Sequence, residues 1–228
     1  MSKSAIATML GAAALGLIRT PSGSNNKVYK PKSVSILYKA SSKRKSETSI
    51  LDLSKISEED ALSTKGINLM GWENLKEVPI GIEIFKNLKY LTLESKFIDN
   101  IDKICELTNL ERLYLKLDNL KDIPTCIKNL INLETLNINA KKAMSVPKEI
   151  GTLTNLYELN FRMSESLRYL PIEIGDLKKL RYVDFYGTRL EIPSRASLQY
   201  WMKNLHPDVV RGIVWDISPN SYSQLRKF

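Results

Sequence analysis

The sequence contains one histidine, two cysteines and no glycine-rich phosphate loop, so it lacks the residue sets on which most catalytic and metal sites depend. His206 precedes a proline, and nothing places a serine or cysteine nucleophile beside it. Two cysteines and one histidine cannot supply the four ligands of a structural zinc site. Neither G-x-x-x-x-G-K-[ST] nor G-x-G-x-x-G occurs. We therefore expect a protein with no enzymatic activity, no cofactor and no bound metal.

Acidic residues are absent from residues 1–46, although this segment contains nine basic residues. Removing these nine from the 34 lysines and arginines leaves 25, which equals the number of acidic residues in the whole chain. The pI near 9.4 therefore reflects a basic N-terminal tail attached to a neutral body. The basic side chains that this tail would use for contacts are Lys27, Lys30, Lys32, Lys43, Arg44 and Lys45.

The sequence also lacks a hydrophobic run long enough to cross a membrane. Its longest apolar stretch, residues 5–18, is shorter than the roughly 20 residues that a bilayer requires. The 1–46 tail fits an organelle transit peptide, a secretory signal or a solvated tail. It also fits a basic arm for anionic membrane or nucleic acid, or a tether to neighbouring subunits of an assembly. The compartment is left open, with an intracellular location favoured and organelle or virion association as alternatives.

The sequence does contain one apolar pattern, L-x-x-L-x-L, that recurs five times at nearly constant spacing. The first leucines of successive copies are 22, 23, 23 and 24 residues apart. A repeat of this length is typical of a solenoid, in which each copy adds one strand to a continuous parallel sheet. The five copies are Leu88, Leu91, Leu93; Leu110, Leu113, Leu115; Leu133, Leu136, Ile138; Leu156, Leu159, Phe161; and Leu180, Val183, Phe185.

A second set of positions keeps the same spacing. Prolines at the middle of most copies precede apolar residues three, six and nine positions later, and a proline suits a turn or the first turn of a short helix. These segments should return the chain along the convex side. The prolines are Pro79, Pro124, Pro147 and Pro171, and four copies also carry an asparagine before the first strand leucine, at Asn87, Asn109, Asn132 and Asn155.

With these positions the chain resembles the leucine-rich repeat family in its 23-residue L-x-x-I-P-x-x-I-x-x-L-x-N-L-x-x-L-x-L form, as found in Ras-group scaffold proteins and plant disease-resistance proteins. The resemblance implies an α/β fold, a leucine-rich repeat solenoid with a curved parallel sheet of about six strands. The asparagine that this family usually places after the strand is missing, so we expect an irregular ascending edge. Its positions hold Lys96, Asp118, Lys141 and Ser164.

The two ends of the repeat region have the features of caps. Residues 47–65 include Ser57 followed by three acidic residues, which is typical of a helix start. Ile67 and Leu69 mark a sixth, degenerate strand, so the repeats should span 66–193. Apolar residues at helical spacing predict a helix over Arg195 to Asn204, within a C-terminal cap of residues 194–228.

Cys105 and Cys126 fall in the convex segments of adjacent copies. As free thiols they suggest a reducing compartment, whereas a disulfide between them is the alternative that the sequence leaves open.

Side chains between the strand leucines should point away from the core, because alternate residues of a strand face opposite sides. They would form a concave face whose tyrosines supply contact area and whose charges have both signs, which favours a protein partner over nucleic acid. The alternative is a structural subunit of a large assembly, tethered by the tail, which alone would contact nucleic acid or anionic membrane. The candidate concave contacts are Tyr90, Glu94, Arg112, Tyr114, Lys116, Asn137, Glu158, Arg162, Tyr182, Asp184 and Tyr186.

Overall fold

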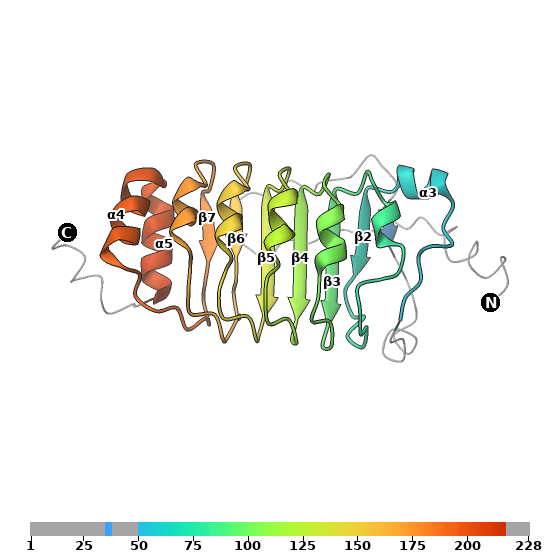
Figure 1. Cartoon of the computed structure of the whole chain (residues 1–228), viewed down its shortest axis with the longest axis horizontal. Helices are drawn as coiled ribbons and strands as arrows, with labels where there is room; N and C mark the ends of the chain where they lie inside the picture. The colour runs from blue at the N-terminus through green and yellow to red at the C-terminus, as the bar shows by residue number, and fades with distance from the viewer. Residues whose placement is uncertain (1–34, 38–49, 218–228) are drawn as a thin grey trace.

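The computed structural model describes residues 35–37 and 50–217, and these residues form one open sheet of seven parallel strands (Figure 1). The strands follow one another in chain order, as expected when each repeat adds one strand beside the last. The predicted parallel solenoid is therefore confirmed, and its six expected strands are β2 to β7. The strands are β1 (Ser35–Leu37), β2 (Gly66–Leu69), β3 (Tyr90–Ser95), β4 (Arg112–Leu117), β5 (Thr135–Ala140), β6 (Glu158–Asn160) and β7 (Tyr182–Asp184).

Strand β1 was not predicted from the sequence. Its three residues lie inside the segment that we assigned to the basic tail, and they pair in parallel with Gly66, Ile67 and Asn68 of β2. Residues 35–37 therefore pair with the sheet, although the sequence placed them within the 1–46 segment. A three-residue strand is too short to show an alternating pattern, and it has no copy of the leucine motif. The six basic tail residues named above lie outside the described residues.

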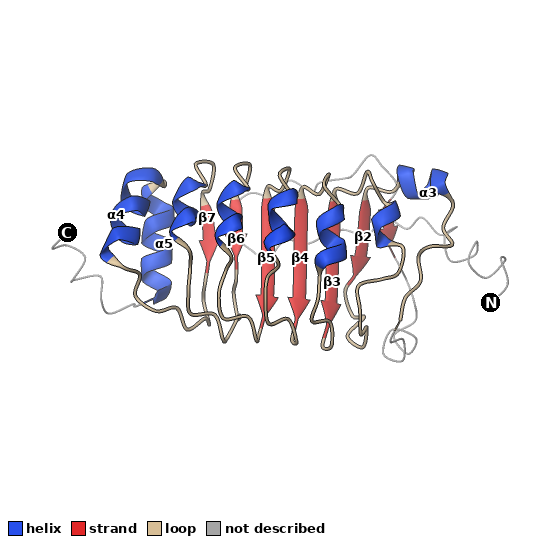
Figure 2. Ribbon diagram, in the orientation of Figure 1, coloured by secondary structure: helices blue, strands red, loops and turns tan. Residues whose placement is uncertain are grey.

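Short 3-10 helices return the chain between strands and form a row along one side of the sheet (Figure 2). The predicted prolines stand immediately before three of them: Pro124, Pro147 and Pro171 have φ values of −71°, −68° and −73°. Proline fixes φ near this value and lacks an N–H, which suits a helix start. The helices are η1 (Ile82–Ile84), η2 (Asp102–Glu106), η3 (Thr125–Asn129), η4 (Lys148–Thr152) and η5 (Ile172–Asp176).

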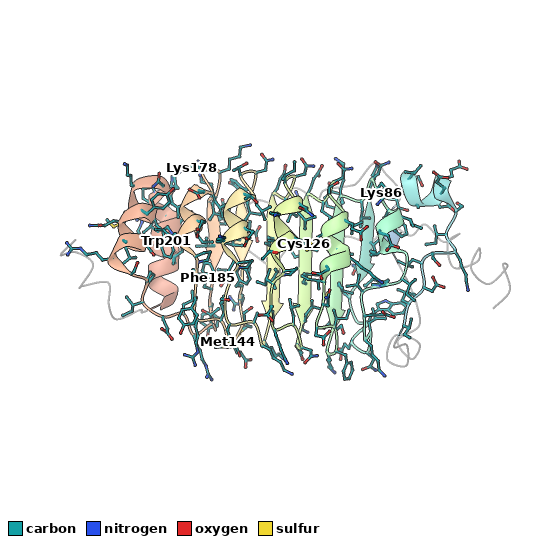
Figure 3. The ribbon with its side chains drawn as sticks, in the orientation of Figure 1. Lys86, Cys126, Met144, Lys178, Phe185 and Trp201 are labelled. Atoms are coloured by element: carbon teal, nitrogen blue, oxygen red, sulfur yellow. A yellow bond between two sulfur atoms is a disulfide. The ribbon has the colours of Figure 1, made fainter. Side chains whose placement is uncertain are left out.

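The core lies between the sheet and this row of helices. The strand leucines of successive copies are aligned by the register, and Leu113, Leu136 and Leu159 are each fully buried. Burying a side chain of this size stabilises the fold by about 1.5–3 kcal/mol. In the last two copies phenylalanines replace leucine, and the rings of Phe161 and Phe185 stack with their centroids 5.9 Å apart. Figure 3 shows Phe185 inside the molecule, toward its C-terminal end.

The regular spacing of the four asparagines has a direct structural reason. The Nδ2 group of each asparagine donates a hydrogen bond to a backbone carbonyl one repeat earlier in the chain. These bonds satisfy carbonyl groups at the edge of the solenoid, where a helix or strand partner is absent. The donor and acceptor pairs are Asn87 to Leu62 (2.9 Å), Asn109 to Lys86 (2.8 Å), Asn132 to Thr108 (3.0 Å) and Asn155 to Ile131 (2.9 Å).

The asparagine that usually follows each strand in this family is missing, and two serines and longer strands supply hydrogen bonds at this edge instead. Buried Ser164 donates its hydroxyl to the carbonyl of Ile138 and accepts from the N–H of Ala140, both at 3.0 Å. Ser95 is also buried, and its hydroxyl accepts two backbone N–H groups and donates to the carbonyl of Leu75. Between these serines, β3, β4 and β5 each extend to six residues and pair directly. Backbone groups at this edge therefore find partners without the asparagine.

Helices cover both ends of the described repeats. Helix α3 (Glu58–Ser63) begins after Ser57, whose side chain accepts the N–H of Asp60, as the acidic helix start predicted. Helix α4 (Arg195–Asn204) occupies the predicted range. Its Trp201 is buried and donates Nε1–H to the carbonyl of Ile172 at 2.9 Å (Figure 3).

Helix α5 (Pro207–Ile217) follows and packs directly against β7. A Cβ atom at Gly212 would lie 2.7 Å from the Val183 side chain, so glycine allows this close approach. Among the described residues, no helix combines the length and apolar character needed to span a membrane.

Candidate functional site

The outward side chains of β3 to β7 and of the residues flanking these strands form one surface, which we call the strand face. It corresponds to the predicted concave face and lies on the side of the sheet opposite the 3-10 helices. Neighbouring strands are about 4.8 Å apart, so aligned side chains are near neighbours. The register aligns two rows: Tyr90, Arg112, Thr135, Glu158 and Tyr182 in the first, and Thr92, Tyr114, Asn137, Asn160 and Asp184 in the second.

Two predicted contacts, Glu94 and Lys116, are held by an interaction within the fold. Glu94 is only 8% exposed, and it accepts hydrogen bonds from the N–H of Gly71 and the Nζ of Lys116, both at 2.7 Å. The Glu94 carboxylate therefore mainly holds β3 against β4. The Lys116 side chain stays half exposed and is the member of the pair that a partner can reach.

Three other predicted contacts, Tyr90, Arg112 and Tyr114, are partly covered by their neighbours. The guanidinium carbon of Arg112 lies 5.8 Å from the ring centroid of Tyr90. The hydroxyl of Tyr90 donates to Glu111 at 3.4 Å. Burial raises the pKa of Tyr114. This part of the strand face therefore presents two tyrosines and one arginine that are only partly exposed.

The exposed aromatic surface lies at the C-terminal end of the strand face, and we call it the C-terminal aromatic patch: Tyr157, Arg162, Tyr182, Asp184 and Tyr186. Its three tyrosines are 46%, 56% and 60% exposed in chain order. Tyr157 and Tyr182 make an edge-to-face contact with their ring centroids 5.2 Å apart. The Arg162 guanidinium lies 4.7 Å from the ring centroid of Tyr186 and 3.3 Å from the Asp184 carboxylate. Large aromatic side chains and an arginine, held by one another, are typical of interface contacts.

Sequence reasoning did not include Tyr157 in the site. It stands one residue before β6, outside the alternation from which the candidates were chosen, at a position that holds Glu111 and Glu134 in the two preceding copies. A tyrosine among charged residues at an equivalent repeat position is the signal that could have identified it. Its backbone N–H pairs with the carbonyl of Glu134, which places it in line with the repeats.

The carboxylate of Glu158 has no ion-pair or hydrogen-bond partner among the described residues, unlike the carboxylates of Glu94 and Asp184. Burial raises the pKa of the Glu158 carboxyl, the Arg112 charge opposes this shift and the Asp184 charge adds to it. The charged carboxylate is therefore disfavoured in the folded protein, which is common where a group is arranged for function rather than for stability.

We expect Glu158→Gln to change the pH dependence of stability. A carboxyl whose pKa is raised on folding stabilises the protein below its unfolded pKa, and this contribution is lost as pH rises through the folded pKa. A glutamine does not ionise, so the stability of the variant does not fall in this way as pH rises. The variant should therefore be at least as stable as wild type at about pH 7, and its stability relative to wild type should be lowest near pH 4. Urea denaturation at both pH values measures the difference, with exposed Glu106→Gln as control. A difference between Glu158→Gln and wild type that is independent of pH would contradict the assignment.

The two cysteines lie on the opposite side of the sheet from the strand face. Cys105 in η2 and Cys126 in η3 form a disulfide, with Cα atoms 5.7 Å apart (Figure 3). The alternative of a disulfide, which the sequence left open, thus holds in the structure, and the interpretation as two free thiols is corrected. Stacking of neighbouring copies brings these residues, 21 positions apart, side by side, which sequence spacing alone does not establish. Within 35–37 and 50–217, no group of three or more metal-ligating side chains is present.

Comparisons with known proteins agree with this architecture. A family profile described as "Leucine-rich repeat region" matches residues 73–207, which is more than half of the chain. No curated protein matches the chain in sequence. Among solved structures, a leucine-rich repeat protein of Leptospira interrogans is 23% identical (TM-score 0.49), with 72% of this chain and 50% of that chain covered.

Two further structures are similar to this chain. The plant peptide hormone receptor RGFR1 in complex with RGF2 is 25% identical (TM-score 0.51), with 70% of this chain and 25% of the receptor covered. An internalin of Listeria monocytogenes is 24% identical (TM-score 0.44), with 66% and 48% covered. The chain thus spans between a quarter and a half of the length of these structures. With the repeated motif, the parallel sheet and the profile match in agreement, the chain belongs to the leucine-rich repeat family.

Proposed function

We propose that this protein is a non-catalytic interaction scaffold that binds a protein partner through the strand face, with the C-terminal aromatic patch as its main contact. The observation that carries the proposal is the gathering of Tyr157, Tyr182 and Tyr186 on one open part of the sheet. Rigid aromatic side chains gain contact area at low entropic cost, and a solenoid presents them on an extended surface.

The charges of the patch support a protein ligand. Arg162 is paired with Asp184, and Glu158 lies beside them in the neighbouring row, so this surface carries no field of a single sign. Nucleic-acid surfaces instead concentrate lysine and arginine against phosphates. The similarity to a receptor whose structure contains a peptide hormone supports the same class of ligand here.

Replacing two tyrosines of the patch tests the proposal. We expect Tyr182→Ala combined with Tyr186→Ala to weaken binding of the partner cross-linked to the chain in its native source by about tenfold or more, because central interface tyrosines each contribute on the order of 1–2 kcal/mol. Both side chains are more than half exposed, so the fold should be unaffected, and thermal unfolding verifies this. The affinity is measured by titration with the purified partner.

A matched control is Tyr169→Ala, which removes a tyrosine of similar exposure that lies away from the patch and is bonded to Glu191. Equal affinities for wild type and the double variant would refute the strand face as the binding surface. If binding is instead lost on replacing Lys43, Arg44 and Lys45, the role as a tethered structural subunit takes its place.

A further inference from the structure

Tyrosines of the strand face pair with charged residues of the neighbouring repeat, and two of these pairs each consist of a tyrosine and an arginine. Tyr90 has Arg112 as its register partner, and the arginine lies over the tyrosine ring. Arg162 lies over Tyr186 in the same way. A guanidinium group over an aromatic face is attracted by the negative charge density of the ring. In both pairs the protein supplies its own cation.

The third pair has the opposite charge. Tyr182 has Glu158 as its register partner, so a carboxylate stands where the first pair has an arginine. Among residues 50–217, no lysine or arginine lies over the ring of Tyr182 or over Tyr157, which contacts its edge. Tyr182 is also 56% exposed, so its ring is accessible from outside.

A receptor for a cation also requires an acidic group that no other side chain neutralises, and Glu158 is such a group. Asp184, its neighbour in the second row, is neutralised by Arg162, whereas no described residue forms an ion pair with the Glu158 carboxylate, on which the Arg112 charge acts only from a greater distance. The nearest arginine of its own row, Arg112, lies over Tyr90, on the far side of Thr135. On its other side the register partner of Glu158 is Tyr182, which carries no positive charge.

We propose that Glu158 and Tyr182 form a subsite for a positively charged side chain, a lysine or an arginine of the protein partner. The proposal rests on the function proposed above and adds the chemistry of the contact. The cation would pair with the carboxylate and lie against the tyrosine ring, which reproduces across the interface the arrangement of the two internal pairs. An ion pair with a half-buried carboxylate is stronger than one at a fully exposed site, because the local dielectric is lower.

Peptides displayed from a random library test this subsite and require no purified partner. The full-length chain is used as bait, in parallel with Glu158→Gln, Glu158→Lys and the control Glu106→Gln, which lies in η2 on the opposite side of the sheet. Peptides that bind wild type, and that bind less to Tyr186→Ala, are retained as ligands of the strand face. We expect lysine or arginine at one position of these peptides, and aspartate or glutamate in its place after selection on Glu158→Lys.

A selected peptide is then measured by titration. We expect Glu158→Gln to weaken its binding about tenfold, and Glu106→Gln to leave it unchanged. Replacing the basic peptide residue by glutamine should cause a similar loss on wild type and little further loss on Glu158→Gln, because both changes remove the same interaction. Comparing lysine with arginine in the peptide identifies which cation the subsite prefers.

Four results would overturn the subsite. Peptides that depend on Tyr186 but carry no preferred basic residue, or that bind Glu158→Gln as tightly as wild type, would refute it and leave the proposed function standing. Selections that yield no peptide dependent on the patch would refute both. A concentration-dependent dimer that Glu158→Gln abolishes would assign the carboxylate to a second copy of this chain.

Discussion

Leu136→Ala is expected to destabilise the protein by about 2–5 kcal/mol, because it removes a fully buried side chain from an inner strand of the sheet and leaves a cavity. Leu136 lies in β5 between Leu113 and Leu159, so the loss affects the packing of three consecutive repeats. In a solenoid each repeat depends on its neighbours, and a central defect cannot be confined to one end. Urea unfolding followed by far-UV circular dichroism measures the change in the free energy of unfolding.

The control for this prediction is the adjacent residue of the same strand. Asn137 points to the strand face, so Asn137→Ala should change stability by no more than about 0.5 kcal/mol. Equal destabilisation by the two substitutions would show that the alternation of inward and outward side chains in β5 is wrong. It would also remove the basis for assigning residues to the strand face.

The double substitution Cys105→Ser with Cys126→Ser is expected to lower the free energy of unfolding by about 3 kcal/mol. The disulfide closes a loop with a sequence separation of 21, and a cross-link of this size restricts the unfolded chain by about that amount. It joins η2 to η3, so it also fixes two adjacent repeats to each other on the side opposite the strand face.

Reduction provides the matched comparison for the cysteine variant. Wild type treated with a dithiol should unfold at the same urea concentration as the double variant, and the double variant should not respond to the reagent. Titration of thiols in denaturant, without reductant, should find none in the purified protein. Two free thiols under these conditions would contradict the disulfide.

Several features of this chain could be predicted from local patterns. The 22- to 24-residue spacing of Leu88 and its equivalents predicted the parallel sheet. Prolines such as Pro124 predicted a turn or a first helical turn, and 3-10 helices begin there. These predictions succeeded because each repeat must bury the same apolar positions against the next. The serine cap at Ser57 and the helix of Arg195–Asn204 could also be predicted, because caps and helical spacing are local signals.

The candidate site was predicted only in part. Alternation placed Tyr182 and Tyr186 on the outward side of the sheet, and both are largely exposed in the structure. It could not show that Glu94 is buried against Gly71, because that contact joins residues 23 positions apart. Nor could it identify Tyr157, which belongs to the aromatic patch because its ring contacts the ring of Tyr182.

The sequence by itself therefore determined the repeat, the six strands that the repeats form and the faces to which their side chains point. These features follow from periodicity along the chain. Only the tertiary structure decided which outward side chains are open and which are paired, that Cys105 and Cys126 are joined, and that Ser35–Leu37 add a strand. Each of these depends on contacts between residues more than 20 positions apart. Stacking of the repeats creates such contacts, and no pattern within one repeat specifies them.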